Sequence, residues 1–258
     1  MGRADEATAA AVAGAVPLAE HPFDAARRQR YELTRTRGGY ALAEEGDELA
    51  VATTPQEACD ALVARSLRRA VELASLKGWV RLRGALVDLN GSRVLLIGPS
   101  GAGKTVLALR LALGGAAFQG DDSVLLHEGS TLAVPCLPML RPGAEELLPE
   151  LAGLLPPASR AGGAASLDPR AALAAPWRLR MARVDHVVVL ERSGRDAICM
   201  PSAPAQVLPH LAGALAPITE SRPMMVGALA AMLSGTRCHT LSVGDPGETE
   251  RALRRAAC

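Results

Sequence analysis

Aromatic residues are scarce in this chain, because phenylalanine, tyrosine and tryptophan together make up 2% of its 258 residues. Proteins that stack on nucleic-acid bases need several exposed rings. A net charge of +1 also provides no basic surface for a phosphate backbone or an anionic membrane. We therefore expect no nucleic acid and no membrane as partners. If the chain binds a nucleotide, we expect the adenine to rest on aliphatic rather than aromatic walls.

The chain also lacks the cysteine patterns of disulfide-linked domains and zinc sites. Its five cysteines are widely spaced and form no C-x-x-C pair, which is typical of free thiols in a reducing cytoplasm. No apolar run approaches the length of a transmembrane helix. Residues 1–15 are alanine-rich, only weakly apolar, and carry charges of both signs, so we expect a mobile tail rather than a signal peptide. The expected location is cytoplasmic.

Lysine is the third scarcity, because only Lys77 and Lys104 contribute to the 28 lysine and arginine residues. Lys104 occupies the one position that requires lysine in the motif G-x-x-x-x-G-K-[ST]. An apolar run precedes this motif and an amphipathic run follows it, so the pattern predicts a buried strand, a phosphate-binding loop and a helix. The motif consists of Gly98, Pro99, Ser100, Gly101, Ala102, Gly103, Lys104 and Thr105.

Each residue type in the motif has a chemical task. Backbone N–H groups can face a triphosphate only if the chain curls tightly, and Gly98, Gly101 and Gly103 permit that curl. The start of the following helix adds unpaired N–H groups and the positive end of its dipole. Lys104 can reach the β- and γ-phosphates, and the Thr105 hydroxyl can hold Mg²⁺. ATP and Mg²⁺ are the expected cofactors.

The pattern of turns and periodicities divides the chain into two domains. Residues 16–80 predict a small α+β module, in which glycine turns separate short strands and a helix over 55–76 follows. Residues 81–258 predict a larger α/β domain that contains the phosphate-binding loop. The strands of the small module are expected at 30–34, 40–42 and 48–52.

Asn90 and Gly91 join two apolar runs, 85–89 and 93–97. Asn-Gly between such runs is the strongest short-range signal of a β-hairpin. The strand before the phosphate-binding loop should therefore have an antiparallel neighbour, whereas doubly wound nucleotide folds usually flank it with parallel strands. We expect a mixed sheet.

Two adjacent aspartates, Asp121 and Asp122, follow a short apolar run at 116–119. If this run is a strand parallel to the strand before the loop, its carboxyl end lies at the same edge of the sheet. Paired carboxylates beside a triphosphate have an evident use, since one can hold Mg²⁺ while the other accepts a proton.

The rest of the chain alternates helical and strand patterns. Residues 143–155 predict a helix that two prolines terminate, and the small, glycine-rich residues 158–169 predict a mobile loop near the site. Further elements are expected as a strand at 184–191, helices near 205–216 and 222–234, a strand at 237–243 and a helix at 248–257.

Several of these segments together resemble the HPr kinase/phosphorylase family. The closer similarity is to its shorter relatives, the HPr-kinase-related proteins of peptide-modification gene clusters, and the strong match covers residues 81–128. The resemblance implies a P-loop kinase core with a mixed sheet, of the HPr kinase/PEP carboxykinase type, after a small N-terminal α+β module. The segments that carry it are 83–88, 98–105, Ala108-Leu109, Gly115-Ala116 and Asp121-Asp122.

The resemblance also implies an activity. Some of these relatives are lasso-peptide tailoring kinases that phosphorylate a serine of the precursor peptide, so it implies an ATP- and Mg²⁺-dependent serine kinase that acts on a protein or peptide. In the family the first aspartate of the pair is taken as the base, which corresponds to Asp121. Asp122 with Thr105 corresponds to the Mg²⁺ site. From the motif itself, Lys104 is the second residue that we expect to act in catalysis. Family members are often oligomeric, which suggests a homo-oligomer here.

The resemblance does not extend to every family signature. Arg83 stands where bifunctional members have a histidine, and the glycine-rich basic run that follows their aspartates is not found. Phosphorylase activity and HPr as the substrate are therefore not implied. Two alternatives also stay open, namely a small-molecule kinase on the same core and a non-catalytic nucleotide-binding module. A plain ATPase ranks below these, because no arginine finger can be singled out among so many arginines.

Overall fold

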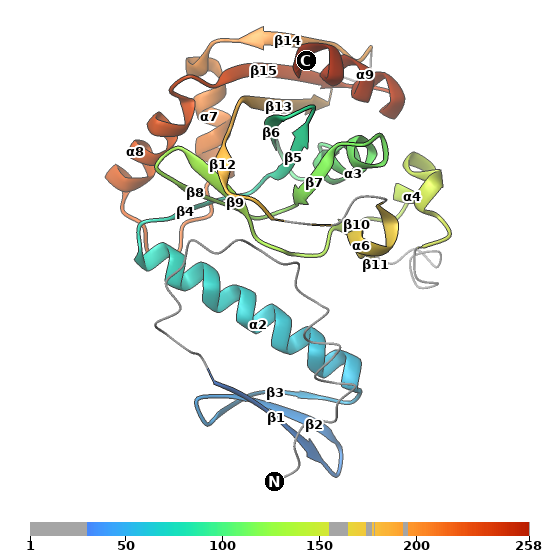
Figure 1. Cartoon of the computed structure of the whole chain (residues 1–258), viewed down its shortest axis with the longest axis vertical. Helices are drawn as coiled ribbons and strands as arrows, with labels where there is room; N and C mark the ends of the chain where they lie inside the picture. The colour runs from blue at the N-terminus through green and yellow to red at the C-terminus, as the bar shows by residue number, and fades with distance from the viewer. Residues whose placement is uncertain (1–29, 155–164, 174–176, 178, 193–195, 258) are drawn as a thin grey trace. The chain divides into compact units, whose positions relative to one another are not determined.

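The structure is a computed structural model that describes residues 30–154, 165–173, 177, 179–192 and 196–257. It divides into two compact units, one up to Val71 and one from Glu72 onwards (Figure 1). The division falls inside the long helix α2 (Pro55–Leu76). The expected tail at 1–15 and residues 158–164 of the expected loop lie outside the described residues.

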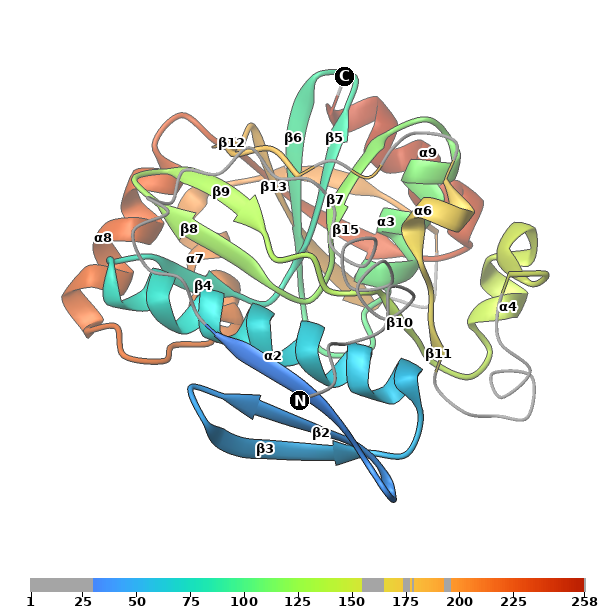
Figure 2. The same cartoon turned by 60° about the horizontal axis from the view of Figure 1, so that its bottom comes forward.

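The first unit is a three-stranded antiparallel meander followed by the start of α2, and all three predicted strands are confirmed (Figure 2). The helix begins at a reciprocal cap, because the Glu57 backbone N–H donates to Thr54 Oγ1 at 3.2 Å and Glu57 Oε2 accepts from the Thr53 N–H at 2.9 Å. Arg65 Nε donates to the buried Glu44 carboxylate at 2.6 Å and ties the helix to the sheet. The strands are β1 (Tyr31–Thr36), β2 (Gly39–Glu44) and β3 (Asp47–Ala52).

The second unit contains the remaining strands and helices. Its strands are β4 (Val80–Leu82), β5 (Ala85–Leu89), β6 (Ser92–Ile97), β7 (Ala117–Gly120), β8 (Val124–His127), β9 (Ser130–Ala133), β10 (Met139–Leu140), β11 (Ala165–Ser166), β12 (Ala182–Arg183), β13 (His186–Arg192), β14 (Cys199–Ser202) and β15 (Arg237–Val243). Its helices are α3 (Lys104–Leu113), α4 (Ala144–Leu147), α6 (Pro169–Ala172), α7 (Pro204–Ala214), α8 (Arg222–Leu233) and α9 (Pro246–Ala257), with a 3₁₀ turn at Pro149–Leu151.

The core of this unit is a six-stranded mixed sheet in the order β14-β15-β13-β6-β5-β7. Strand β13 runs parallel to both β6 and β15, whereas β5, β7 and β14 pair antiparallel with their neighbours. The two central parallel strands are buried on both faces, which explains the continuous apolar runs 94–97 and 187–190. The predicted mixed sheet is confirmed.

The predicted hairpin between β5 and β6 is also confirmed. Asn90 and Gly91 have φ angles of 51° and 86°, so both central residues of the turn are left-handed, as a type I′ turn requires. Strand β7 pairs with the far side of β5 and therefore runs in the same direction as β6. The carboxyl ends of β6, β7, β13 and β15 consequently lie at one edge of the sheet.

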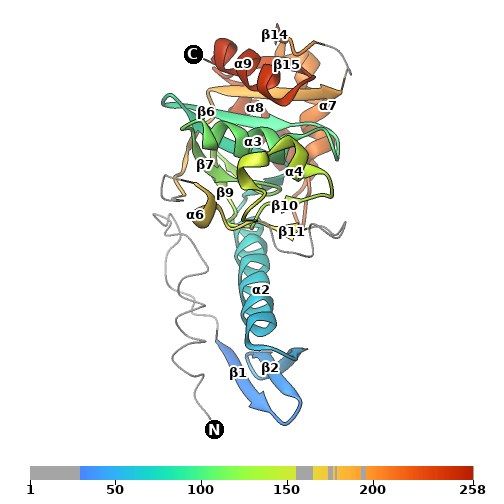
Figure 3. The same ribbon diagram turned by 90° about the vertical axis from the view of Figure 1, so that its right-hand side faces the viewer.

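Helices cover the six-stranded sheet on opposite sides. Figure 1 and Figure 3 show α3 and α9 together on one side and α7 with α8 on the other. A second, four-stranded sheet has the order β12-β9-β8-β4, and α8 packs on its strands β4 and β8. The predicted helices and strands after residue 200 agree with α7, α8, β15 and α9 within about two residues at most ends, as expected from fraying.

The helix predicted over 143–155 is wrong in its length. The chain forms only α4 and then a separate 3₁₀ turn that starts at Pro149. Proline disfavours the helical region for the residue before it, and Leu148, with φ −135° and ψ 62°, has left that region. Among the described residues, no helix combines the length and the apolar character that a membrane crossing would need.

Candidate active site

The loop between β6 and α3, residues 98–103, is built around three glycines in the left-handed region. Gly98, Gly101 and Gly103 have φ angles of 146°, 81° and 98°. Gly98 is also required by packing, because a Cβ at this position would lie 2.7 Å from the carbonyl oxygen of Leu190. These angles agree with the prediction that the glycines permit a tight curl, and the curl leads directly into the start of α3.

Lys104 is the first residue of α3, and its side chain folds back over the loop. Its Nζ donates to the carbonyl oxygens of Gly98 at 2.9 Å and Pro99 at 3.0 Å. Burial lowers the pKa of the Lys104 ammonium, and the nearby carboxylates of Asp121 and Asp122 raise it in part. The ammonium thus lies beside the loop with carbonyl oxygens as its hydrogen-bond acceptors.

Thr105 connects the loop to the aspartate pair after β7. Its Oγ1 donates to Asp121 Oδ2 at 2.6 Å, although 16 residues separate the two in the chain. Asp121 is 5% exposed, and burial raises the pKa of its carboxyl while the hydrogen bond from Thr105 lowers it. The structure therefore brings Thr105 into direct contact with Asp121, whereas the resemblance pairs Thr105 with Asp122.

Asp122 lies in a different environment from its neighbour. Its φ angle is 64°, its side chain is 70% exposed, and its Oδ2 lies 3.9 Å from a guanidinium nitrogen of Arg81. The Ser123 N–H donates to the Asp121 carbonyl at 2.8 Å, and this tight turn presents the Asp122 side chain to solvent. One carboxylate of the pair is buried against the loop, and the other is accessible beside it.

Arg141 is a residue of this site to which the sequence analysis assigned no role. Its Nη2 donates to Ser100 Oγ at the tip of the loop at 2.7 Å, and its Nη1 lies 3.4 Å from the position that a Cβ on Gly101 would take. The residue follows β10, 41 positions from Ser100. The one local signal is the sequence Leu-Arg-Pro-Gly at 140–143, and with so many other arginines in the chain it is not specific.

The oxygen atoms at this edge suit a magnesium ion. Thr105 supplies a hydroxyl, and Asp121 and Asp122 supply carboxylates, all of which are hard oxygen donors. Among the described residues, no group of three or more His, Cys, Asp and Glu side chains gathers to hold a metal. Mg²⁺ usually needs only one or two carboxylates, because substrate phosphates and water complete its shell, so the residues present fit this ion.

No family model matches the chain, and no curated protein matches it either. Solved structures similar to it include the HPr(Ser) kinase/phosphatase from Coxiella burnetii. That protein shares 14% sequence identity with the chain, and the alignment covers 68% of this chain and 95% of that one with a TM-score of 0.37. A score of this size supports no conclusion about activity, so the function has to be inferred from the contacts of the chain itself.

Proposed function

We propose that this protein is an ATP- and Mg²⁺-dependent kinase that transfers the γ-phosphoryl group to a serine hydroxyl of a protein or peptide. The observation that carries the proposal is the 2.6 Å hydrogen bond between Thr105 and Asp121. It places a buried carboxylate directly against a glycine loop that has a lysine and a helix start, which is the combination that phosphoryl transfer requires.

The loop holds the nucleotide in this proposal. Backbone N–H groups of the curl and the N-terminus of α3 face the β- and γ-phosphates. Lys104 exchanges the carbonyl oxygens of Gly98 and Pro99 for phosphate oxygens, which are stronger acceptors because they are charged. Thr105 and Asp122 would hold Mg²⁺. The bound ion would neutralise charge that develops on the phosphates.

Asp121 acts as the base. It takes the proton of the acceptor hydroxyl as the hydroxyl oxygen forms a bond to the γ-phosphorus, and the bond from that phosphorus to the β–γ bridging oxygen breaks to release ADP. Burial raises the pKa of the Asp121 carboxyl, which makes it a better proton acceptor than an exposed aspartate. Positioning and charge neutralisation supply most of the acceleration.

Arg141 adds a second cation to the transfer. Its guanidinium already contacts the loop tip through Ser100. We propose that it turns from this hydroxyl to the oxygens of the transferred phosphoryl group, where its planar fork matches two oxygens at once. An arginine supplied by the same chain in this way stabilises the charge of the transition state.

The contact between Thr105 and Asp121 also favours an exchanged division of labour between the aspartates. In that version Asp121 orients Thr105 at the metal, and the exposed Asp122 takes the hydroxyl proton. The variants Asp121→Asn and Asp122→Asn separate the two. Substitution of the residue that serves the metal should raise the Mg²⁺ concentration needed for half-maximal rate. Substitution of the base should instead lower kcat at saturating Mg²⁺.

The acceptor is the least constrained part of the proposal. The resemblance to the HPr-kinase-related proteins favours a serine of a precursor peptide, as in lasso-peptide biosynthesis, with the reaction in the cytoplasm and the enzyme as a homo-oligomer. A metabolite acceptor on the same core is the alternative, because the net charge of +1 does not demand a macromolecular substrate. A non-catalytic nucleotide-binding module is the other alternative.

The test is transfer from γ-labelled ATP to candidate peptides, each compared with its serine-to-alanine version, and to metabolite pools. We expect an added phosphate on the serine peptide by mass spectrometry, loss of about 10²–10⁴-fold in turnover for Asp121→Asn, and retained ATP binding. Label only in metabolites would identify a small-molecule kinase. ATP binding without transfer to either pool would identify a binding module, and unchanged turnover in Asp121→Asn would remove the base role.

A further inference from the structure

Two arginines, Arg81 and Arg83, lie close to the aspartate pair and have no part in the mechanism above. Arg81 belongs to β4, and Arg83 directly follows that strand. The residues that alternate with them, Val80, Leu82 and Gly84, are buried, whereas Arg81 is partly exposed and Arg83 is exposed. Because side chains alternate between the two faces of an extended chain, both arginine side chains leave the chain on the same face.

The strand order places Arg83 between the phosphate-binding loop and the aspartates. Strand β5 lies between β6 and β7 and runs antiparallel to both. The start of β5 therefore lies at the sheet edge where β6 ends in the loop and β7 ends before Asp121. Arg83 is two residues before β5, and a Cβ on the intervening Gly84 would lie 2.9 Å from the Leu96 carbonyl oxygen near the end of β6. The Arg83 backbone N–H donates to the Ala214 carbonyl at 2.7 Å, which fixes the chain at this point.

Arg81 approaches the aspartates from β4. This strand pairs with β8 so that Leu82 lies opposite Val124, and the antiparallel register brings the chain after Leu82 beside Ser123. Arg81 Nε donates to Ser123 Oγ at 2.8 Å, and its Nη2 lies 3.9 Å from Asp122 Oδ2. A guanidinium thus lies beside the exposed Asp122 carboxylate.

The charges of the two guanidiniums are incompletely neutralised. The contact between Arg81 and Asp122 is long, and the Asp122 side chain is 70% exposed, so water weakens the attraction. Among the described residues, no carboxylate lies within ion-pair distance of Arg83. Burial lowers the pKa of the Lys104 ammonium, and the Arg83 guanidinium lowers it further, which indicates that positive charge extends from the loop to this arginine.

An acceptor hydroxyl that reaches Asp121 brings its neighbouring groups past these two guanidiniums. A carboxylate there would gain charge-assisted hydrogen bonds, because a planar guanidinium matches both of its oxygens at once. A lysine or arginine side chain in the same place would be repelled by both cations. The charge of Asp122 opposes the preference for a carboxylate, but Arg81 and, in the proposed mechanism, Mg²⁺ offset that charge.

We infer that Arg81 and Arg83 select an acceptor peptide with an acidic side chain, aspartate or glutamate, within about two residues of the serine that receives the phosphoryl group. The distance follows from the spacing of the arginines, since two residues of an extended chain span about 7 Å. The inference rests on the proposed function, because it requires transfer to a peptide hydroxyl, and it names the class of peptide. Arg83 is the specificity-determining residue with the less compensated charge.

Transfer from γ-labelled ATP by the full chain to short synthetic peptides tests the inference. Each peptide has one serine in an alanine and glycine background, with aspartate, asparagine or lysine at one position within about two residues of the serine. We expect kcat/KM for the best aspartate peptide to exceed that of its asparagine partner by at least about fivefold, and that of its lysine partner by more. Higher salt should reduce this ratio, because the cations lie near the surface.

Substitution of Arg83 identifies the source of the preference. Arg83→Gln should reduce the aspartate-to-asparagine ratio to about twofold, the part that Arg81 retains, and Arg83→Lys should keep more of it. Arg83→Glu should raise kcat/KM for the lysine peptide relative to the aspartate peptide by at least about fivefold over the unaltered chain. Arg255→Gln removes an exposed arginine of α9 and is the matched control, which should keep the ratio of the unaltered chain.

The outcomes separate the inference from the function on which it rests. No transfer to any peptide or metabolite would refute both the kinase and the acidic acceptor. Transfer to peptides without regard to the charge beside the serine, or only to metabolites, would overturn the inference and leave a kinase. A loss in Arg83→Gln that is equal for the aspartate and asparagine peptides would also overturn it, because the guanidinium would then act on the transferred phosphoryl group.

Discussion

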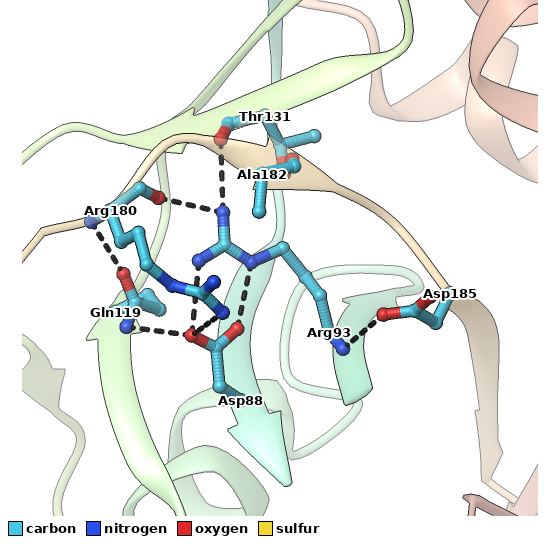
Figure 4. Close-up of polar contacts among 7 residues, drawn as sticks. All are labelled: Asp88, Arg93, Gln119, Thr131, Arg180, Ala182 and Asp185. Carbon is cyan, nitrogen blue, oxygen red and sulfur yellow. Dashed lines mark hydrogen bonds and ion pairs between the residues drawn. The ribbon is translucent and has the colours of Figure 1, made fainter. Parts of the chain in front are cut away.

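Charged clusters lie at the two ends of strand β6 and differ in how their cations are paired. Near its first residues, Arg93 is 1% exposed, and its Nε and Nη2 donate to the two oxygens of Asp88 at 2.7 and 3.1 Å (Figure 4). At the other end, Lys104 donates to backbone carbonyls, and Arg141 donates to a hydroxyl. Among the described residues, no carboxylate lies within ion-pair distance of either of these two cations.

The hairpin end is a closed network. Arg93 Nη1 also donates to the carbonyl oxygens of Thr131 and Arg180, at 3.1 and 2.7 Å, while Asp88 accepts further bonds from Gln119 and Arg180 (Figure 4). Such a network ties β5 and β6 to β9 and to the chain before β12. A buried charge is tolerated when each of its polar groups has a partner, so this cluster serves the fold.

The cluster at the loop end is open, in the sense that Lys104 and Arg141 have no carboxylate within ion-pair distance among the described residues. Its cations are near weak, neutral acceptors that a charged ligand can replace, and a third cation, the guanidinium of Arg83, contributes to the positive potential at Lys104. Keeping such groups together costs stability unless an anion binds between them. The comparison teaches that the state of pairing, and not the number of charges, distinguishes a structural cluster from a binding site.

The largest effect is expected from a substitution that disrupts the closed cluster around Arg93. Asp88→Ala leaves Arg93 buried without its counter-charge, and we expect a loss of about 3–5 kcal/mol in the free energy of unfolding by denaturant titration. Arg170→Ala is the control, because its pair with Asp168 at 2.7 Å is on the surface with side chains 36% and 38% exposed, and it should change stability by less than about 1 kcal/mol. Equal losses in both variants would refute the distinction.

The next largest effect is expected from a substitution in the open cluster at the loop. Lys104→Met removes the cation that we place on the β- and γ-phosphates, and we expect turnover to fall by about 10³-fold without loss of thermal stability. Lys77→Met removes the other lysine of the chain, at the end of α2, and should leave turnover unchanged. A Lys104→Met protein with normal turnover would show that the loop cation has no role in transfer.

Arg141 tests whether the open cluster extends beyond the loop. We expect Arg141→Ala to lower kcat by about 10²-fold and Arg141→Lys to recover only part of it, because lysine keeps the charge and lacks the planar fork. Arg255→Gln on α9 removes an exposed arginine outside the site and serves as the control. An effect on KM alone would limit Arg141 to ground-state binding.

The smallest expected effect is the dependence of kcat on pH. Asp121 must be ionised to accept a proton, and burial raises the pKa of its carboxyl above the ordinary value of 3.8. The kcat should therefore be constant at neutral pH and fall as the pH decreases through a value above 3.8. In Asp122→Asn this acidic limb should persist. Its disappearance there would transfer the base role to Asp122.

Much of the loop end could be predicted because its determinants are local. Glycine at 98, 101 and 103, the Asn90-Gly91 turn and the two apolar strands act within a few residues, where backbone sterics and period-two burial decide the outcome. The helix over 143–155 was predicted wrongly, because Pro149 was not treated as a break.

The contacts that could not be predicted join residues far apart in the chain. Arg141 meets Ser100 across 41 positions, and Arg93 meets the Arg180 carbonyl across 87. Arginine is so abundant here that residue type alone selects none of them, and only the strand pairing shows which guanidinium is closed into a network and which is left open.

The amino-acid sequence by itself determined a glycine loop that leads into a helix, an antiparallel neighbour for its strand, and a pair of aspartates a short strand later. Those features depend on turn chemistry and on periodicity, which neighbouring residues settle. Only the tertiary structure decided that Asp121 is buried against Thr105 while Asp122 is exposed, and that the start of β5 lies between the loop and the aspartates. Burial and proximity are set by which strands pair, and the pairing is a property of the whole sheet.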